Sequence, residues 1–255
     1  ANTKKKHIIL APTGIAAINA GGSTLHSFFK LPFHPLLPND SMYSVRNIRN
    51  TLKYNSEKIK IIREVELIII DEISMVRADI IDFLDKILRV YCRNMREPFG
   101  GKQLLLVGDI FQLEPVVRED DRRLLSPFYR SSFFFNAKVF EYFTLVSIEL
   151  KKVYRQSDSV FISILDHIRT SQVPMQDLQR LNQRVGAQLD ESDSKLAITL
   201  STRRDTVDYI NDSQLQRLPG EPCLFRGHIQ GEFPESSLPT PIELYLKTGA
   251  YLHQE

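Results

Sequence analysis

The sequence predicts an α/β protein built around a parallel β-sheet, and three apolar runs carry that prediction. The runs lie at 7–14, 66–72 and 103–109, and each stops at a small or an acidic residue. Continuous apolar runs, as opposed to alternating ones, are typical of strands that are covered on both faces. Segments with helical spacing separate the runs, which favours a parallel sheet with helical crossovers.

The segments between the runs differ in character. After the second run, apolar residues recur at steps of three and four, which predicts one helix with a core-facing side. They are Val76, Ile80, Phe83, Leu84, Ile87, Leu88 and Tyr91. Residues 31–62 instead begin with three prolines, which break any regular element, and continue with polar, Asn-rich sequence; this predicts an insertion or small subdomain.

A second unit is predicted to begin after Glu149. Ser157 and Asp158 are candidate N-caps of a helix that follows them. Residues 195–218 predict a strand, a turn and a helix, whereas 218–241 are rich in Pro and Gly and predict loops.

Composition limits the size of the core, the classes of binding partner and the cellular environment that we expect. A chain of 255 residues with 42% hydrophobic content can bury a core of one or two domains. A net charge of +2 is too mild to indicate a nucleic-acid partner by itself. Two cysteines without metal-like spacing predict no disulfide framework, and no apolar run reaches membrane length. We expect a soluble, intracellular protein without a membrane partner.

Two carboxylates, Asp71 and Glu72, follow the most apolar run, where burying charge is costly. An aspartate at such a strand end holds Mg²⁺ in P-loop ATPases, and a neighbouring glutamate can deprotonate the attacking water. The alternative is a pair of helix-capping acids, because carboxylates favour a helix N-terminus. From these residues alone the two interpretations are equally supported.

Polar groups follow the other two runs. Asp109 and Gln112 come after the third, where a glutamine could contact a γ-phosphate or serve only as a turn residue. After the first run, hydroxyls and an imidazole lie among glycines, a set that suits a phosphodiester backbone. Phe28 and Phe29 nearby are candidates for base stacking or for the core. Further along, Arg155 is a candidate arginine finger or a surface residue.

The order of these motifs is more specific than any one of them. "APTGIAAINAGGSTLHSFF", "IIIDEISM", "PFGGKQLLLVGDIFQLEPV" and "VYRQSDSVF" resemble motifs Ia, II, III and IV of superfamily-one DNA helicases. Residues 80–106 are similar to the signature region of the petite integration frequency (PIF) family of 5′-to-3′ helicases. "DTVDYINDSQL" and "LKTGA" are similar to later elements of that family.

The resemblance implies a RecA-like domain over 1–150, with a 1B subdomain at about 31–62, and part of a second RecA-like domain over 151–255. It implies that Asp71 holds Mg²⁺, that Glu72 is the catalytic base, and that Gln112 and Arg155 contact the γ-phosphate of ATP. It also assigns residues to single-stranded DNA. These are Thr13, Gly14, Thr24, His26 and Ser27 on the first domain and Ser201, Thr202 and Arg203 on the second.

The implied activity is ATP-dependent 5′-to-3′ translocation by a monomer on single-stranded DNA, with unwinding at single-strand/duplex junctions. Forked duplex, G-quadruplex and RNA–DNA hybrid remain open as substrates. The implied roles are DNA repair, recombination and telomere maintenance, in the cytoplasm or nucleoid of a bacterium, or in the nucleus or mitochondrion of a eukaryote. The alternative function is a non-enzymatic single-stranded DNA-binding module on the same scaffold.

The chain departs from the family pattern in two ways. It contains no GxxxxGK[ST] phosphate-binding motif, and the family's motifs V and VI are missing. Without that loop, bound phosphates lack a backbone cradle, a lysine and a hydroxyl ligand for Mg²⁺. We therefore expect an internal fragment of a helicase that does not hydrolyse ATP on its own.

Overall fold

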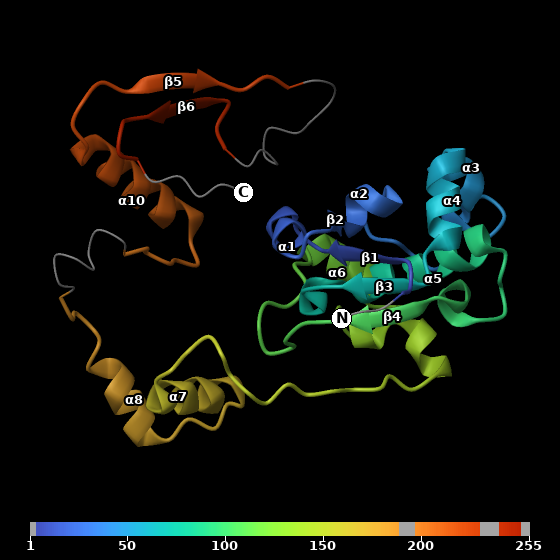
Figure 1. Cartoon of the computed structure of the whole chain (residues 1–255), viewed down its shortest axis with the longest axis horizontal. Coiled ribbons are helices and arrows are strands. Elements are labelled where there is room, and N and C mark those ends of the chain that lie inside the picture. The colour runs from blue at the N-terminus through green and yellow to red at the C-terminus, as the bar shows by residue number, and fades with distance from the viewer. Residues whose placement is uncertain (1–3, 189–196, 230–239, 251–255) are drawn as a thin grey trace. The chain divides into compact units, whose positions relative to one another are not determined.

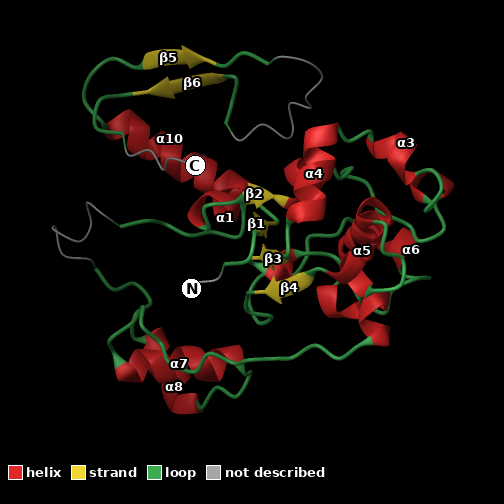
Figure 2. Cartoon of the chain, turned by 45° about the vertical axis from the view of Figure 1, so that its right-hand side comes forward, coloured by secondary structure: helices red, strands yellow, loops and turns green. Residues whose placement is uncertain are grey.

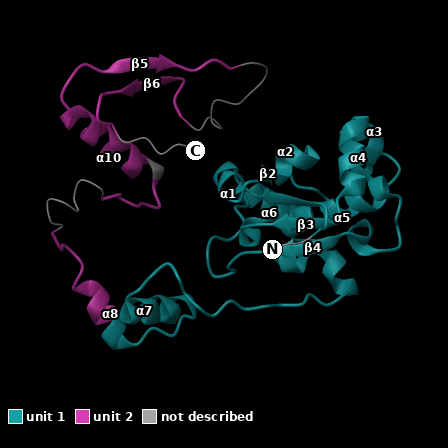
Figure 3. Ribbon diagram, viewed as in Figure 1, with its two compact units in different colours: residues 1–177, 255 teal, residues 178–254 magenta. Residues whose placement is uncertain are grey.

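The structure is a computed structural model that describes residues 4–188, 197–229 and 240–250 (Figure 1). It contains two compact units, which divide between residues 177 and 178 (Figure 3). The boundary at 150/151 and the 1B subdomain at 31–62 stay predictions.

The first unit is organised around a four-stranded parallel sheet, which confirms the predicted α/β class (Figure 2). The strands are β1 (His7–Ala11), β2 (Ser23–Thr24), β3 (Leu67–Ile70) and β4 (Gln103–Leu106), in the order β2-β1-β3-β4. In the register, Ile70 lies opposite Leu10 on one side and Leu106 on the other. The carboxyl ends of the three predicted strands are therefore level with one another.

Helices and short 3₁₀ turns connect and cover the strands. The α-helices of this unit are α1 (Gly14–Asn19), α2 (Leu25–Phe29), α3 (Ile48–Leu52), α4 (Ser56–Glu64), α5 (Ala78–Cys92), α6 (Glu119–Leu125) and α7 (Ser159–Arg169). The 3₁₀ turns are η1 (Ser41–Tyr43), η2 (Ile73–Met75), η3 (Pro98–Gly101), η4 (Phe134–Asn136) and η5 (Lys138–Tyr142). Helix α8 (Met175–Asn182) spans the boundary between the units.

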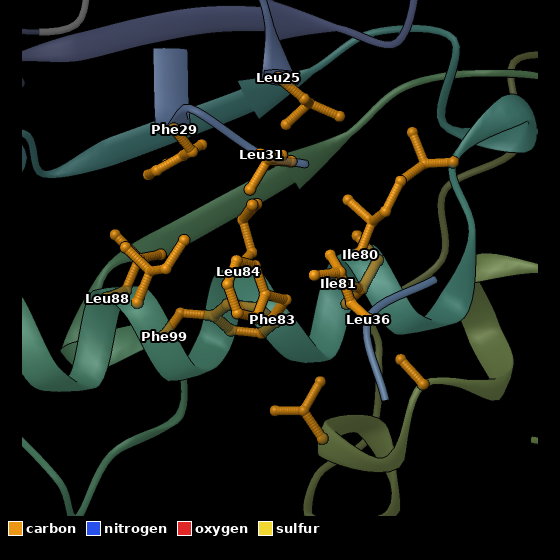
Figure 4. Packing of buried hydrophobic residues seen from close by; sticks show 14 of the residues in the cluster. Leu25, Phe29, Leu31, Leu36, Ile80, Ile81, Phe83, Leu84, Leu88 and Phe99 are labelled. Carbon is orange, nitrogen blue, oxygen red and sulfur yellow. The ribbon is translucent and has the colours of Figure 1, made fainter. Parts of the chain in front are cut away.

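The predicted helix after the second strand is α5, and it forms one wall of the core. All seven residues predicted for its core-facing side are buried. In Figure 4, Leu84 and Leu88 of α5 point towards the segment that follows β2, where Leu25, Phe29 and Leu31 are buried. Strand β4 departs from the prediction of cover on both faces, because Leu105 is 48% exposed.

The segment 31–62 contains both irregular and helical parts. The three prolines leave 31–40 without helix or strand, as predicted, and η1, α3 and most of α4 lie in the remainder. Asn47 and Asn55 directly precede α3 and α4, and the Asn55 side chain accepts a hydrogen bond from the backbone N–H of Lys58 at the start of α4. Ile48 and Leu52 of α3 join the core of the first unit.

The second unit contains α10 (Arg204–Arg217) and an antiparallel pair, β5 (Cys223–Arg226) and β6 (Glu243–Leu246). Helix α10 confirms the helix predicted within 195–218, but the strand predicted before it is absent from the described residues 197–200. Strand β5 lies in the segment predicted as loops, where it pairs with β6 along four residues. Its cross-strand partners begin seventeen residues after its last residue, so local composition did not indicate it.

Two further findings concern membrane-spanning helices and the cysteines. In the described parts, no helix has the length and apolarity needed to cross a membrane. Cys92 and Cys223 are both free, as their spacing predicted.

Candidate functional site

The candidate site begins at the carboxyl end of β3. The backbone N–H of Asp71 donates to the carbonyl of Leu10 at 2.9 Å, so the aspartate is fixed at the top of the sheet. One carboxylate oxygen of Asp71 accepts a hydrogen bond from the backbone N–H of Glu72 at 3.0 Å. Asp71 is half-buried, at the edge where ligands of open parallel sheets bind.

Glu72 adopts a backbone conformation that is costly for a residue with a side chain. Its φ of 50° and ψ of 45° lie in the left-handed region. Such conformations cost on the order of 1–3 kcal/mol, and they cluster at functional sites. Helix α5 begins only at Ala78, after Arg77, and its start has no side-chain cap. Glu72 occupies the N-cap position of η2, but its side chain makes no capping hydrogen bond there, and neither acid caps α5.

The turns after β3 and β4 are joined by backbone hydrogen bonds. Val107 donates its N–H to the carbonyl of Ile70 at 2.8 Å, and Ile73 donates to the carbonyl of Val107 at 3.0 Å. Gly108 permits this approach, because a Cβ at that position would lie 2.9 Å from the backbone nitrogen of Ile73. The segment that carries Glu72 is thus held against the segment that leads to Gln112.

Gln112 ends a turn organised by Asp109. The carboxylate of Asp109 accepts hydrogen bonds from the backbone N–H of Phe111 at 3.0 Å and from Nε2 of Gln112 at 3.4 Å. The backbone N–H of Gln112 donates to the carbonyl of Asp109 at 3.1 Å. Gln112 itself is exposed, so its amide is oriented by the turn while remaining accessible to a ligand.

The side chains at this edge of the sheet could bind Mg²⁺ only if nucleotide phosphates supplied the other ligands. No group of three or more potential ligating side chains occurs among the described residues. Mg²⁺ is usually bound by one or two carboxylates plus substrate phosphates, so a lone Asp71 is a sufficient protein contribution. On the next turn, the fully buried hydroxyl of Ser74 has no hydrogen-bond partner among the described residues.

Arg155 lies in the extended segment that precedes α7, and it is exposed. Asp158, a predicted N-cap, accepts hydrogen bonds from the backbone N–H groups of Val160 and Phe161. No described contact brings Arg155 to the carboxylates, so its role stays a prediction. A different arginine contacts the Gln112 turn: the guanidinium carbon of Arg169 lies 5.6 Å from the Phe111 ring centre. No sequence pattern indicated that residue.

The first-domain DNA candidates gather at the N-termini of two short helices. The hydroxyl oxygen of Thr13 accepts from the backbone N–H of Ala16 at 3.3 Å, and that of Thr24 accepts from Ser27 at 3.1 Å. Both hydroxyls keep their O–H free to donate to a phosphate oxygen. Gly14 and Ser27 are exposed at the same helix starts.

His26 of α2 stacks on Phe33, with ring centres 5.1 Å apart and planes 7° apart. Burial lowers the pKa of His26, and the charge of Arg77 lowers it further. Two phenylalanines were candidates for base stacking or for the core. Phe29 is fully buried, so it belongs to the core. Phe28 is half-buried, and the Lys58 ammonium lies 3.6 Å from its ring centre.

The second-unit DNA candidates are exposed residues just before α10. Ser201 accepts a hydrogen bond from the backbone N–H of Arg203 at 3.1 Å, and Thr202 lies between them. The Arg203 guanidinium is paired with Asp205 and lowers the pKa of that carboxyl through its hydrogen bond.

Comparison with known proteins identifies the family. The model of a family described as PIF1-like helicase matches residues 1–178. The chain belongs to this family. ATP-dependent DNA helicase PIF1 of Saccharomyces cerevisiae is 32% identical over 251 residues, and that of Homo sapiens is 32% identical over 249 residues. These matches cover 95% of this chain but only 27% and 36% of the two relatives.

Solved structures of PIF1-like helicases resemble the chain as a whole. A Bacteroides Pif1 bound to single-stranded DNA is 41% identical with a TM-score of 0.82, and the match covers 96% of this chain and 55% of that one. A Bacteroides Pif1 in complex with ADP-AlF3 and single-stranded DNA is 39% identical with a TM-score of 0.80, and the shares covered are 96% and 55%.

Proposed function

We propose that the chain carries part of the motor of an ATP-dependent DNA helicase that moves 5′-to-3′ on single-stranded DNA. The observation that carries the proposal is the linkage of two strand ends. Glu72, in its strained conformation beside Asp71, is hydrogen-bonded through Ile73 and Val107 to the segment that leads to Gln112. A catalytic base and a phosphate-contacting amide need such a fixed relation to act on one phosphate.

Each residue has a defined part in hydrolysis. Asp71 would hold Mg²⁺, which when bound neutralises developing phosphate charge. Glu72 would accept a proton from the attacking water, and Gln112 would hydrogen-bond the γ-phosphate. Arg155 would approach the same phosphate and stabilise the charge that develops in the transition state.

Neutral donors and one arginine are proposed to hold the DNA. Thr13, Gly14, Thr24, His26 and Ser27 would grip the phosphodiester backbone at one point, and Ser201, Thr202 and Arg203 at a second point. Closing and opening around ATP would move one grip relative to the other. Acting as a monomer, the motor would separate single-strand/duplex junctions and structured DNA such as a G-quadruplex.

The chain has no GxxxxGK[ST] motif and spans about a third or less of the two curated relatives described above. We therefore propose that these 255 residues alone do not hydrolyse ATP. The measurement is DNA-stimulated phosphate release by this polypeptide, with Glu72→Gln as the comparison. Turnover well above background that Glu72→Gln removes would contradict this part of the proposal.

A second experiment separates a motor from a plain binding module. Fluorescence anisotropy measures the affinity of the chain for a labelled oligothymidine, with and without millimolar Mg-nucleotide. If the chain belongs to a motor, its affinity for the oligothymidine should change when nucleotide is added. The Asp71→Asn variant should lose this nucleotide effect. Glu119→Gln, an exposed acid in α6, is the matched control and should keep the effect. Salt-dependent binding without any nucleotide effect would favour the module.

A further inference from the structure

Phe33 is a large apolar side chain that is 87% exposed in a firmly anchored loop. On one side, Leu31 is buried and its backbone N–H donates to the carbonyl of His26 at 3.0 Å. On the other side, Leu36 is buried and its N–H donates to the carboxylate of Asp79 at 2.9 Å. The exposure of Phe33 is therefore set by its anchors and does not come from a loose loop.

The anchor at Asp79 is a strong one. Its fully buried carboxylate receives two hydrogen bonds from the Arg77 guanidinium, at 2.8 and 2.7 Å, in addition to the one from Leu36. Buried ion pairs hold their geometry, because separating the charges in a dry interior is costly. Prolines precede Phe33 and follow His34, and their fixed φ angles limit the loop further.

His26 holds the Phe33 ring in a defined plane. The two rings are nearly parallel, and this leaves one face of Phe33 towards the histidine and the other towards solvent. Burial and then the nearby Arg77 lower the pKa of His26, which favours the uncharged imidazole in this stack. The result is a rigid aromatic surface with room for one more flat ring.

Two lysines lie beside α2. Lys30 follows that helix directly, and the ammonium of Lys58 lies 3.6 Å from the ring centre of Phe28 within it. In the described ranges, no acid forms an ion pair with either lysine. Aromatic surfaces beside cations that lack acidic partners are typical of sites for single-stranded nucleic acid, where a base stacks and a phosphate is neutralised.

We propose that Phe33, backed by His26, is a stacking platform for one base of single-stranded DNA. The proposal rests on the DNA binding proposed above and adds a base contact to a site that otherwise consists of phosphate donors. The platform accepts any base, because every base presents a flat face to the ring.

The test compares Phe33→Ala with Phe33→Trp in the full 255-residue chain. The probes are a labelled oligothymidine and a matched oligomer of abasic units, which keeps the phosphates but has no bases. Phe33→Ala should weaken oligothymidine binding roughly five- to a hundred-fold, because the stacked base is lost. Phe33→Trp should retain it. On the abasic oligomer, wild type and Phe33→Ala should bind equally.

Phe135→Ala is the matched control. Phe135 is 45% exposed and stacks on Phe133 at 5.3 Å, but it lies outside the α2 region. The Phe135→Ala substitution should leave the affinity for oligothymidine unchanged. Circular dichroism should give the same melting curve for Phe33→Ala and wild type.

The outcomes separate the platform from the function on which it rests. Loss of binding in Thr24→Ala together with wild-type binding in Phe33→Ala would overturn the platform and leave DNA binding in place. An equal loss by Phe33→Ala on both oligomers would also overturn it, because the effect would not depend on bases. Failure of the wild-type chain to bind oligothymidine would overturn both proposals.

Discussion

The backbone N–H of Ile73 donates to the carbonyl of Val107 at 3.0 Å, and this bond joins the turns that follow β3 and β4. Ile73 is the residue after Glu72, and Val107 is five residues before Gln112. Parallel strands place their carboxyl ends at one edge of a sheet, but they do not fix how the following turns meet. The Ile73–Val107 bond supplies that relation between the two parts of the candidate site.

Gly108→Ala should disrupt this relation. The added Cβ would lie 2.9 Å from the backbone nitrogen of Ile73 and 3.1 Å from its Cγ2 atom, so the turn must move. We expect a loss of about 1–3 kcal/mol in the free energy of unfolding, the usual cost of overpacking. Urea unfolding followed by circular dichroism measures it.

Gly14→Ala is the matched control for that variant. A Cβ at Gly14 meets no atom within 4 Å, and neither glycine has a positive φ. Gly14 opens α1, where alanine is compatible with the backbone, so we expect equal or slightly higher stability. Equal unfolding curves for Gly108→Ala and wild type would contradict the close approach of the two turns.

Glu72→Asn should stabilise the fold while removing the proposed base. Asparagine enters the left-handed region more readily than glutamate, because its short side chain can hydrogen-bond locally. With φ at 50°, the relief should be about 0.5–1 kcal/mol in the free energy of unfolding. Chemical denaturation checks this, and Glu114→Asn, at an exposed residue without positive φ, is the control. A destabilised Glu72→Asn would mean that the carboxylate makes contacts that outweigh the strain.

Much of the fold followed from local pattern. The three apolar runs became β1, β3 and β4, and the stripe from Ile80 to Tyr91 became the buried side of α5, with Val76 buried just before that helix. Local pattern did not predict the helices within 31–62, because asparagine favours loops and helix caps alike. It also missed β5, whose hydrogen-bonding partner β6 lies seventeen residues further along the chain at its nearest end.

The candidate site was predicted unevenly. Asp71, Glu72 and Gln112 follow strands, so strand prediction locates them. The conformation of Glu72 has no compositional signal, because most left-handed residues are glycine or asparagine. Phe33 was missed for a similar reason: its exposure depends on an anchor at Asp79, 46 positions away, which no local window contains.

Stability should fall as the pH is lowered past the ordinary pKa of histidine because of His26. Burial, and then the charge of Arg77, lower its pKa in the folded state, and the weaker opposing influence of Asp79 does not reverse this. Below about pH 6.5 the unfolded chain binds a proton that the folded chain does not, so acid favours unfolding until the folded-state pKa is passed. Urea titrations at pH 7.5, 6.5 and 5.5 measure the slope. His26→Gln should have a shallower slope than wild type, and identical slopes would contradict the assignment.

Asp79→Asn should be among the most damaging single substitutions in the first unit. The variant leaves the guanidinium of Arg77 buried without its counter-charge and weakens the hydrogen bond that anchors Leu36. Breaking a buried pair by removing one charge costs about 3–5 kcal/mol in the free energy of unfolding. Glu64→Gln, which breaks an exposed pair with Lys6 at a similar distance of 2.9 Å, should leave the unfolding midpoint near that of wild type. Replacing both members of the buried pair, as Arg77→Met with Asp79→Leu, should recover much of the loss, because no uncompensated charge remains. If Asp79→Asn alone unfolds like wild type, the carboxylate is not the anchor of the Phe33 loop.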